Sequence, residues 1–519
     1  MLLRHVAVLI LSLCFAQAAI AQNAPEITLR SEEALGAFKE TGLIIEKLTM
    51  TADVRAGLAQ VSLGATLRNE TEDDVEASFA YPLPANAVIN HYALDIDGEL
   101  VDGVLLPKER AEKLYTDRVT QSIDPGIAAR SLDNRYKTRI YPIAADGGRR
   151  SIQLGFTVPV PAAGLHLPFQ SDTPIESVTI HITGEGAQTA IRPFEPDTTL
   201  NQNFSGGIFI PAAPAETALS QYNETTFITV PLAANRESRE RDVKSVAVIW
   251  DSSLSRQASD LAQERRFVRD ILSQLSPNTQ SLSHGAQQVD FKADYNSPAA
   301  LVAELETLQY DGATNLSALL DSKALNDADV CLIITDGRST FGDGEIPDLP
   351  CRAFTYSASK NPNTPWLSLV AARNAGANLT GLSASDARAQ IITKSEFQLA
   401  PGQAGDIFHF GSRSWFIAPV TERQRQFKIK FQTHEKNIAL RRLSKAPHPA
   451  AAAIWGQRQI ETLRADGPSR FDDIVAASRR WSVQSSETSF LVLESAEEYV
   501  EAELTPPRNF PADLSLIHI

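Results

Sequence analysis

The sequence contains few of the residues from which metal clusters and disulfide frameworks are built. Its 519 residues include three cysteines and nine histidines. No C-x-x-C pattern, no H-E-x-x-H pattern and no cluster of cysteine with histidine occurs, which argues against a zinc site. No G-x-S-x-G motif occurs either, so the nucleophile turn of the α/β-hydrolases is excluded.

Positive charge and long apolar stretches are also scarce. The chain has 48 Lys and Arg residues against 63 Asp and Glu residues, which gives a net charge of −15 at pH 7. We expect neither nucleic acid nor an anionic membrane as the main partner, because both repel an acidic protein. Beyond the N-terminal segment no apolar stretch is long enough to span a bilayer. The length indicates about three domains.

The two ends of the chain carry features outside the expected domains. Residues 1–21 have the pattern of a signal peptide, with Arg4 and His5, an apolar segment at 6–15 and an A-x-A cleavage pattern at 19–21. We therefore expect export to the periplasm, the cell surface or the outside of the cell. Residues 514–519 translate the mosaic-end sequence of a transposase used to prepare sequencing libraries. We expect them to be an adapter artefact after Asp513, so that the natural C-terminus is missing and membrane anchoring is undetermined.

Three polar motifs occur in the middle of the chain, each at the end of an apolar run or in a loop. The run 246–250 is followed by D-x-S-x-S, the loop 312–315 has the pattern G-x-T-N, and the run 330–335 leads into T-D-G. Such runs indicate buried parallel strands, and open α/β sheets bind ligands beyond the carboxyl ends of their strands. Carboxylate and hydroxyl oxygens are suitable ligands for Mg²⁺. The side chains concerned are those of Asp251, Ser253, Ser255, Thr314 and Asp336.

These three motifs, in this order, resemble the metal-ion-dependent adhesion site of von Willebrand factor A domains. The resemblance implies that the five residues hold a divalent cation, Mg²⁺ or else Mn²⁺ or Ca²⁺. It also implies that an Asp or Glu carboxylate of a protein partner completes the coordination. Alternating strands and helices predict a doubly wound parallel sheet at 241–395. We predict strands at 245–253, 287–292, 330–335, 352–357 and 377–382, and helices at 259–276, 298–308, 316–325 and 366–374.

Two cysteines open predicted strands that this fold places side by side. Cys331 and Cys351 can form a disulfide there in an oxidising compartment. The alternative is that they are two small, buried apolar residues. The sequence leaves both possibilities open.

The N-terminal region is rich in predicted strands. Alternating apolar and polar residues predict strands at 43–51 and 58–67. Further strands are expected at 77–81, 88–96, 136–142 and 151–160, with a short helix at 108–115. The segments FAYPLP at 79–84, DGELVDG at 97–103 and KERAEKLY at 108–115, with DPG at 124–126 and YPI at 141–143, resemble the vault protein inter-alpha-trypsin (VIT) domain. We therefore predict a VIT domain at 42–161. A VIT domain followed by a von Willebrand A domain is similar to the inter-alpha-trypsin heavy chains, here of a bacterial type.

The predicted fold class is therefore multidomain, α/β plus β. A β-rich connector with a charged linker is expected at 162–240, with strands at 177–183 and 226–230. A C-terminal region of β-hairpin and helices is expected at 396–513. Its predicted hairpin strands are 407–420 and 426–433, its helices are 450–463 and 471–479, and its segment 488–494 resembles the one that closes proteins of this domain pair.

Three functions are compatible with these predictions. The first is a secreted or cell-envelope binding protein, not an enzyme, that uses the metal site for protein–protein interaction or adhesion. The alternative is a structural or assembly protein of the envelope whose metal site has no recognition role. The third, a metal-assisted hydrolase with two aspartates, lacks an evident general base, because His284, the nearest histidine, lies in a predicted loop.

Overall fold

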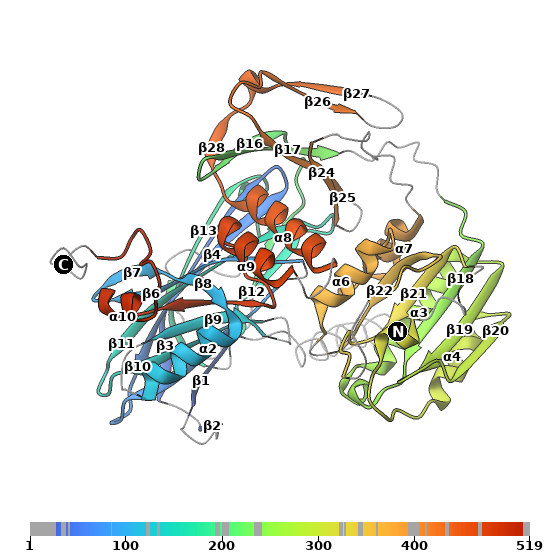
Figure 1. The fold of residues 1–519 in the computed structure, drawn as a ribbon, viewed down its shortest axis with the longest axis horizontal. Coiled ribbons are helices and arrows are strands. Elements are labelled where there is room, and N and C mark those ends of the chain that lie inside the picture. Colours follow the sequence, from blue (N-terminus) through green and yellow to red (C-terminus); the bar gives the residue numbers. More distant parts are fainter. Residues whose placement is uncertain are drawn as a thin grey trace, which may run out of the picture.

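Extended segments of alternating apolar and polar residues make up much of the chain, and they pair into several sheets (Figure 1). The computed structural model describes residues 27–32, 38–39, 42–84, 86–120, 125–131, 135–171, 173–191, 198–199, 207–232, 241–320, 325, 328–340, 346–359, 362–392, 404–410, 413–430, 435–465 and 470–511. The predicted signal peptide at 1–21 and the suspected adapter at 514–519 lie outside these residues. Within them, none of the helices has the length and apolar character needed to cross a membrane.

Two seven-stranded sheets face each other in the N-terminal region. Their strand orders are β2-β1-β5-β10-β9-β29-β8 and β14-β13-β3-β4-β11-β6-β7. Strand β6 has the predicted bounds, and α2 begins at the predicted residue but extends further. The elements are β1 (Thr28–Glu32), β2 (Phe38–Lys39), β3 (Leu43–Arg55), β4 (Leu58–Asn69), β5 (Val75–Pro82), β6 (Val88–Ile96), β7 (Glu99–Asp102), β8 (Val104–Pro107), α2 (Lys108–Thr120), β9 (Gly126–Arg130), β10 (Arg135–Ile143), β11 (Arg149–Pro159), β12 (Leu165–Pro168), β13 (Ile175–Gly184), β14 (Thr198–Thr199) and β15 (Gly207–Ile210).

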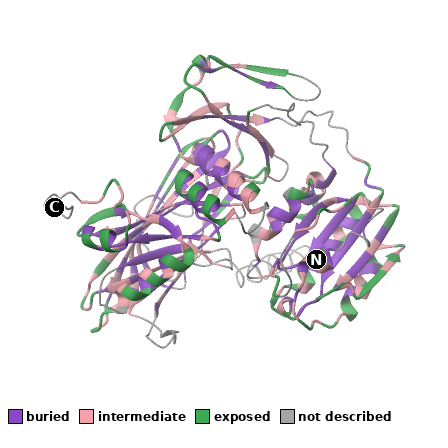
Figure 2. Cartoon of the chain, in the orientation of Figure 1, coloured by how far each residue is buried: buried purple, intermediate pink, exposed green. Residues whose placement is uncertain are grey.

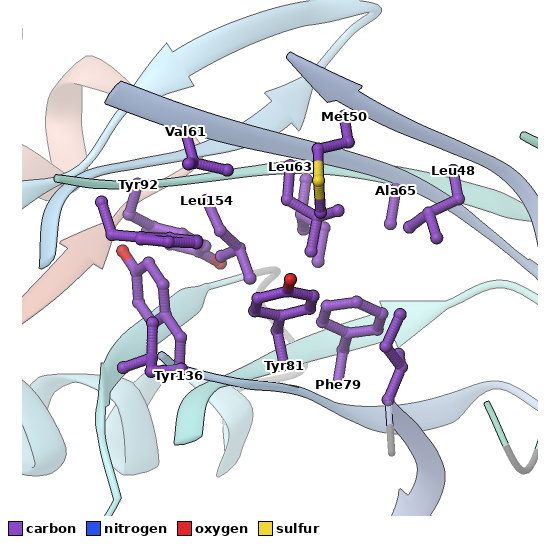
Figure 3. Close-up of a cluster of buried hydrophobic side chains, with 14 of the residues drawn as sticks. Leu48, Met50, Val61, Leu63, Ala65, Phe79, Tyr81, Tyr92, Tyr136 and Leu154 are labelled. Carbon is purple, nitrogen blue, oxygen red and sulfur yellow. The ribbon is translucent and has the colours of Figure 1, made fainter. Parts of the chain in front are cut away.

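Side chains between these two sheets form the largest core of the protein. From Ala59 onward every second residue of β4 is buried, which is the pattern of a strand with one face in a core. Figure 3 shows Met50 and Leu63 of one sheet pointing toward Tyr81 of the other. Tyr81 also stacks on Phe156, with ring centroids 5.8 Å apart. Full burial of an apolar side chain of this size contributes about 1.5–3 kcal/mol, so this core dominates the stability of the region.

A strand from the far C-terminal part of the chain belongs to the first of these sheets. Strand β29 (Thr488–Val492) pairs antiparallel with both β8 and β9, and all five of its residues are buried. Phe490 joins the core between the sheets, whereas Leu491 packs with Ala111 and Tyr115 of α2 on the other face. The sequence placed this segment in a separate C-terminal region. The structure makes it part of the N-terminal sandwich, because both of its faces are apolar and both find apolar partners there.

A five-stranded sheet combines strands from the middle and the C-terminal part of the chain. Its order is β24-β25-β17-β16-β28. One face packs against α8 (Ala450–Ala465) and α9 (Phe471–Trp481), and the other against the hairpin of β26 (Gln426–Lys430) and β27 (Glu435–Ala439). The strands are β16 (Ala218–Tyr222), β17 (Thr225–Leu232), β24 (Asp406–Phe410), β25 (Arg413–Val420) and β28 (Lys445–Pro447). The segment 162–240 is therefore divided among three sheets: β13 and β14 belong to a seven-stranded sheet, β12 and β15 form a two-stranded sheet, and β16 and β17 belong to the five-stranded sheet. The segment 407–420 contains two strands rather than one.

A six-stranded sheet lies between β17 and β24 in the sequence, with the order β20-β19-β18-β21-β22-β23. Its elements are β18 (Ser245–Asp251), α3 (Leu261–Leu275), β19 (Thr279–Gly285), β20 (Phe291–Tyr295), α4 (Pro298–Thr307), α5 (Leu316–Leu319), β21 (Val330–Ile334), β22 (Arg352–Tyr356), α6 (Thr364–Arg373), β23 (Ala377–Asn378) and α7 (Ala384–Ile392). Helices α3, α4 and α7 pack on one face, and α5 and α6 pack on the other. Figure 2 shows the central strands of this sheet as buried, and β18, β21 and β22 are the buried ones. Helices thus cover both faces, as the sequence predicts.

Two features of this sheet differ from the prediction. The second strand is β19, whereas the sequence placed a strand at 287–292, because the segment Thr279–Gly285 contains few apolar residues. Strand β20 then pairs antiparallel with β19, so the sheet is mixed rather than wholly parallel. The short connection between these strands permits a hairpin, whereas a parallel neighbour needs a crossover of about a dozen residues.

Cys331 and Cys351 form a disulfide, with their Cα atoms 5.7 Å apart. Cys331 lies in β21, and Cys351 directly precedes the parallel neighbour β22. Both residues are buried in the core beneath α5 and α6. Of the two alternatives that the sequence left open, the disulfide is the one present.

Candidate metal centre

The first candidate residue is the last residue of β18, a buried strand in the middle of the six-stranded sheet. Strand β18 lies between β19 and β21, both parallel to it. Asp251 ends the strand, and its side chain is fully buried. The chain then enters the 3₁₀ helix η3 (Leu254–Ala258). Asp251 thus lies at the carboxyl edge of the sheet, where such sheets bind ligands.

Both carboxylate oxygens of Asp251 accept hydrogen bonds. Oδ1 accepts one from the backbone N–H of Ser253 at 2.9 Å, and Oδ2 accepts one from the hydroxyl of Thr335 at 2.6 Å. The second bond follows from the strand register: Trp250 pairs with Ile334, so the next residues, Asp251 and Thr335, lie side by side. A carboxylate has about four lone-pair sites, so each oxygen keeps one with which it can coordinate a cation.

Hydrogen bonds connect the loop of Thr314 to the loop that follows β18 and to the loop that follows β21. Leu254 N–H donates to the carbonyl oxygen of Gly312 at 3.1 Å. Thr314 N–H donates to the hydroxyl of Thr340 at 2.9 Å, and the carbonyl oxygen of Thr314 accepts from Thr340 N–H at 2.9 Å. The side chain of Thr314 is buried. This loop is therefore held on both sides by the other two motif segments.

Asp336 lies in the turn that follows β21, and it too is buried. Its Oδ1 accepts a hydrogen bond from Arg338 N–H at 3.0 Å, and its carbonyl oxygen accepts one from Asn363 N–H at 2.7 Å. Gly337 has a φ of 74°, in the left-handed region that favours glycine, so the glycine of T-D-G is required by the turn. The structure thus brings all three predicted segments together at one edge of the sheet.

The hydroxyl groups of the first motif lie close to each other. The Oγ atoms of Ser253 and Ser255 are 3.2 Å apart, with Ser253 buried and Ser255 half-buried. Between them Leu254 exposes 53% of its surface. No group of three or more His, Cys, Asp or Glu side chains suited to a metal ion occurs among the described residues. A cation at this edge would therefore depend on hydroxyl and water oxygens as well as on two carboxylates, a donor set that suits Mg²⁺, Mn²⁺ or Ca²⁺.

A fully buried ion pair holds the loop of the first motif against helix α3. Arg256 Nη1 donates to Glu264 at 3.2 Å, and Arg256 Nε donates to the carbonyl oxygen of Asp251 at 3.3 Å. Glu264 Oε1 in turn accepts from Ala358 N–H at 2.7 Å. Burial lowers the pKa of Arg256, but the charges of Glu264 and Asp251 outweigh it and the pKa is raised. The guanidinium therefore stays charged, and the loss of either partner would leave an uncompensated buried charge.

The negative charge of Asp251 is only partly compensated by neighbouring positive charge and hydrogen bonds. Burial raises its pKa, and the charge of Arg256 and the hydrogen bond from Thr335 offset only part of this effect. A buried carboxylate with a raised pKa lacks sufficient positive charge or hydrogen bonds nearby. A divalent cation would supply that charge, so the residues present fit such an ion.

Several residues of this site were not identified from the sequence. Thr335 ends the predicted buried strand and begins T-D-G, but the motifs assign it no role in the site. The register of two parallel strands would have placed its hydroxyl next to Asp251. Arg256 and Glu264 pair only because α3 packs back against the loop, so no local sequence pattern predicts their ion pair.

Known proteins give a match for one part of the chain. Residues 45–156 match the family of the vault protein inter-alpha-trypsin domain. No curated protein matches the sequence. Among solved structures, the pilus adhesin SpaC from Lactobacillus rhamnosus GG is 10% identical with a TM-score of 0.23, and the similarity covers 43% of this chain and 46% of the adhesin. A candidate nutrient-binding protein from Legionella pneumophila is 11% identical with a TM-score of 0.17, over 30% of this chain and 53% of its own.

This chain thus spans about half the length of each of those two solved chains. The family match lies within the segment 42–161 and begins and ends in strands of the N-terminal sandwich, β3 and β11. It confirms the predicted resemblance for that segment. Residues 45–156 of this chain form a VIT domain.

Proposed function

We propose that this protein is an exported binding protein whose six-stranded sheet carries a metal-ion-dependent adhesion site of the von Willebrand A type. Asp251, Ser253, Ser255, Thr314 and Asp336 would hold one divalent cation, Mg²⁺ or else Mn²⁺ or Ca²⁺. The cation supplies a coordination position for an Asp or Glu carboxylate of a protein partner. The observation that carries the proposal is the convergence of three motif segments, with two buried carboxylates, at one edge of the sheet.

The surface next to this edge supports a protein partner. Leu254 is more than half exposed, although Ser253 before it and Arg256 two residues after it are buried. An exposed leucine beside a buried polar site offers apolar area that a partner presenting a carboxylate could bury.

The remaining geometry favours binding over hydrolysis. His284, the histidine closest to the first motif in the sequence, pairs in register with Trp250 rather than with Asp251. Its ring stacks on Phe291, with centroids 5.0 Å apart. A general base must reach the water that it activates, and this ring is engaged on the hairpin of β19 and β20 instead.

Export is supported by the covalent structure. The disulfide between Cys331 and Cys351 is buried in the sheet core, and such bonds persist in oxidising compartments and are rare in the cytosol. It agrees with the signal-peptide pattern of residues 1–21. We therefore propose a location in the periplasm, at the cell surface or outside the cell.

The test is capture of envelope proteins on the immobilised full chain in Mg²⁺ and in EDTA. We expect capture in Mg²⁺, loss of capture in EDTA, and loss in Asp251→Ala. Asp242→Ala, which changes an exposed aspartate near the opposite end of β18, is the matched control and should capture normally. Capture that persists in EDTA and in Asp251→Ala would contradict the adhesion site and favour a structural or assembly role.

A second pair of variants tests the apolar contact separately. Leu254→Asp should abolish capture while Mn²⁺ still binds, because the leucine contacts the partner and not the ion. Val500→Asp places the same change at a residue of equal exposure, 53%, on α10 (Ala496–Glu501), and should have no effect. Equal capture by Leu254→Asp and the wild type would show that the partner does not contact Leu254.

A further inference from the structure

The hairpin of β26 and β27 and the residues that flank it are rich in positive charge, although the chain as a whole is acidic. The segment 421–447 contains eight Arg and Lys residues and two Glu residues, whereas the whole chain has a net charge of −15. All eight basic side chains are exposed. We call them the basic hairpin surface: Arg423, Arg425, Lys428, Lys430, Lys436, Arg441, Arg442 and Lys445.

The alternation of β26 separates its apolar face from its charged face. Phe427 and Ile429 are buried against the five-stranded sheet, and Phe427 contacts Phe416 with ring centroids 5.4 Å apart. Successive side chains of a strand point to opposite faces, so Lys428 and Lys430 point away from that sheet. Figure 2 shows most of this hairpin as exposed, at the edge of the molecule.

The arginines gather at the base of the same hairpin. Leu440 N–H, in the 3₁₀ helix η5 (Leu440–Arg442), donates to the carbonyl oxygen of Arg425 at 3.1 Å. This bond places the pair Arg441 and Arg442 beside the segment that contains Arg423 and Arg425. The basic side chains thus gather on one hairpin and at its base, with Lys428 and Lys430 on the outer face and Lys436, which pairs with Ile429, on the opposite face.

Very little of this charge is neutralised within the protein. Among the described residues, one ion pair involves the basic hairpin surface, between Lys428 and Glu435 at 3.5 Å, with both side chains more than one-third exposed. A hydrogen bond from Asn437 and the charges of Lys428 and Lys430 lower the pKa of Glu435, which is consistent with a positive potential there. An exposed surface with this excess of one sign attracts an extended anionic partner.

We propose that the basic hairpin surface binds the anionic face of a phospholipid bilayer. The six large apolar side chains exposed among the described residues all lie outside segment 421–447, so the described part of this surface offers no exposed aromatic ring for stacking on a sugar or base. It is instead an exposed hairpin at one edge of the molecule, where its basic side chains can approach a flat array of headgroups. Each basic residue near such a surface contributes about 1 kcal/mol of attraction, which falls off within a Debye length of about 8 Å, so the acidic remainder of the chain is screened.

The test is sedimentation of the full chain with vesicles of phosphatidylcholine containing three-tenths phosphatidylglycerol, and with vesicles of pure phosphatidylcholine. All samples contain EDTA, so that a divalent cation at Asp251 plays no part and a failure of the adhesion-site proposal leaves this result unchanged. We expect binding to the anionic vesicles at low salt, loss of binding at high salt, and no binding to the neutral vesicles.

Two variants with equal charge change locate the surface. Arg425→Gln, Lys428→Gln and Lys430→Gln combined should weaken binding about a hundredfold. Lys108→Gln, Lys244→Gln and Arg266→Gln combined remove three exposed basic side chains elsewhere and should leave binding within about twofold. Equal binding by both variants, salt-insensitive binding, or retention by an acidic polysaccharide without binding to the vesicles would overturn the proposal. Thermal unfolding of both variants at the wild-type temperature would show that the hairpin remains folded.

Discussion

Thr335 donates its hydroxyl hydrogen to Oδ2 of Asp251 at 2.6 Å, across the carboxyl ends of two neighbouring parallel strands. The same Thr335 oxygen accepts from Gly337 N–H at 3.1 Å. One side chain therefore orients the buried carboxylate and also fixes the turn that carries Asp336. It links two motifs of the candidate metal centre, although it belongs to neither set of predicted ligands.

Replacing this hydroxyl should weaken the binding of a divalent cation. Thr335→Val keeps the shape of the side chain but removes the hydrogen bond, and we expect Mn²⁺ affinity to fall about 10- to 100-fold, as is typical for partners that orient a ligand. Thr335→Ser restores the hydroxyl and should restore most of the affinity. Isothermal titration calorimetry measures both. An unchanged affinity in Thr335→Val would show that the bond has no part in cation binding.

Removing the disulfide should destabilise the fold. Cys331 and Cys351 are separated by 20 residues in sequence, and closing a loop of about that length stabilises a protein by about 3 kcal/mol. We expect the double variant Cys331→Ala, Cys351→Ala to lose about this free energy of unfolding, as measured by urea denaturation. Wild-type protein in a strong reductant is the control and should approach the variant. If oxidised wild type and the double variant unfold at the same urea concentration, the bond does not support the fold.

Truncating Phe490 should loosen the N-terminal sandwich although the residue lies near the other end of the chain. Phe490 is buried in β29, which pairs with β8 on one side and β9 on the other. Phe490→Ala should therefore lower the free energy of unfolding by about 3–5 kcal/mol. Hydrogen exchange should accelerate at the amides of β8 and β9. Phe471→Ala, at a phenylalanine on α9 that is 38% exposed, should leave those amides unchanged. Protection of β8 and β9 that survives Phe490→Ala would mean that the two strands do not depend on β29.

The pair of Glu487 and Arg464 should make stability depend on pH in the acid range. Burial alone would raise the pKa of Glu487, but hydrogen bonds from Arg464, one of them 2.7 Å long, outweigh it and the pKa is lowered below its usual 4.5. The stabilisation is therefore complete above about pH 4.5 and is lost as the pH falls through the folded-state pKa. We expect Glu487→Gln to cost about 1 kcal/mol at pH 7 and less at pH 3.

Urea denaturation across this pH range measures the effect of Glu487→Gln. Glu306→Gln, at an exposed glutamate of α4, is the control. A variant that loses the same stability at pH 3 as at pH 7 would contradict the assigned role of the ion pair.

The parts of the fold that local patterns encode were accessible from the sequence. Strand β6 has its predicted bounds because it is rich in apolar residues and a D-G turn ends it. Strand β19 was missed because its residues are mostly polar, and its middle position in the sheet depends on pairing with β18 and β20. The place of β29 could not be predicted, since its partners β8 and β9 are several hundred residues away in the sequence.

The candidate site divides in the same way. The polar residues of the three motifs stand at strand ends and in loops, and the sequence named the five that the structure gathers at one edge. The ion pair of Arg256 and Glu264 depends on the path of α3, and the exposure of Leu254 depends on the η3 turn. Such properties are set by packing, which the order of residues alone does not reveal.

The central claim is that the edge of the six-stranded sheet holds one divalent cation. The most direct measurement is Mn²⁺ binding to the full chain, followed by electron paramagnetic resonance of free Mn²⁺, in the wild type and in Asp251→Ala, Asp336→Ala and Asp242→Ala. The account predicts one bound Mn²⁺ per chain in the wild type and in Asp242→Ala, and none in the other two variants. One Mn²⁺ bound with wild-type affinity by folded Asp251→Ala would contradict it.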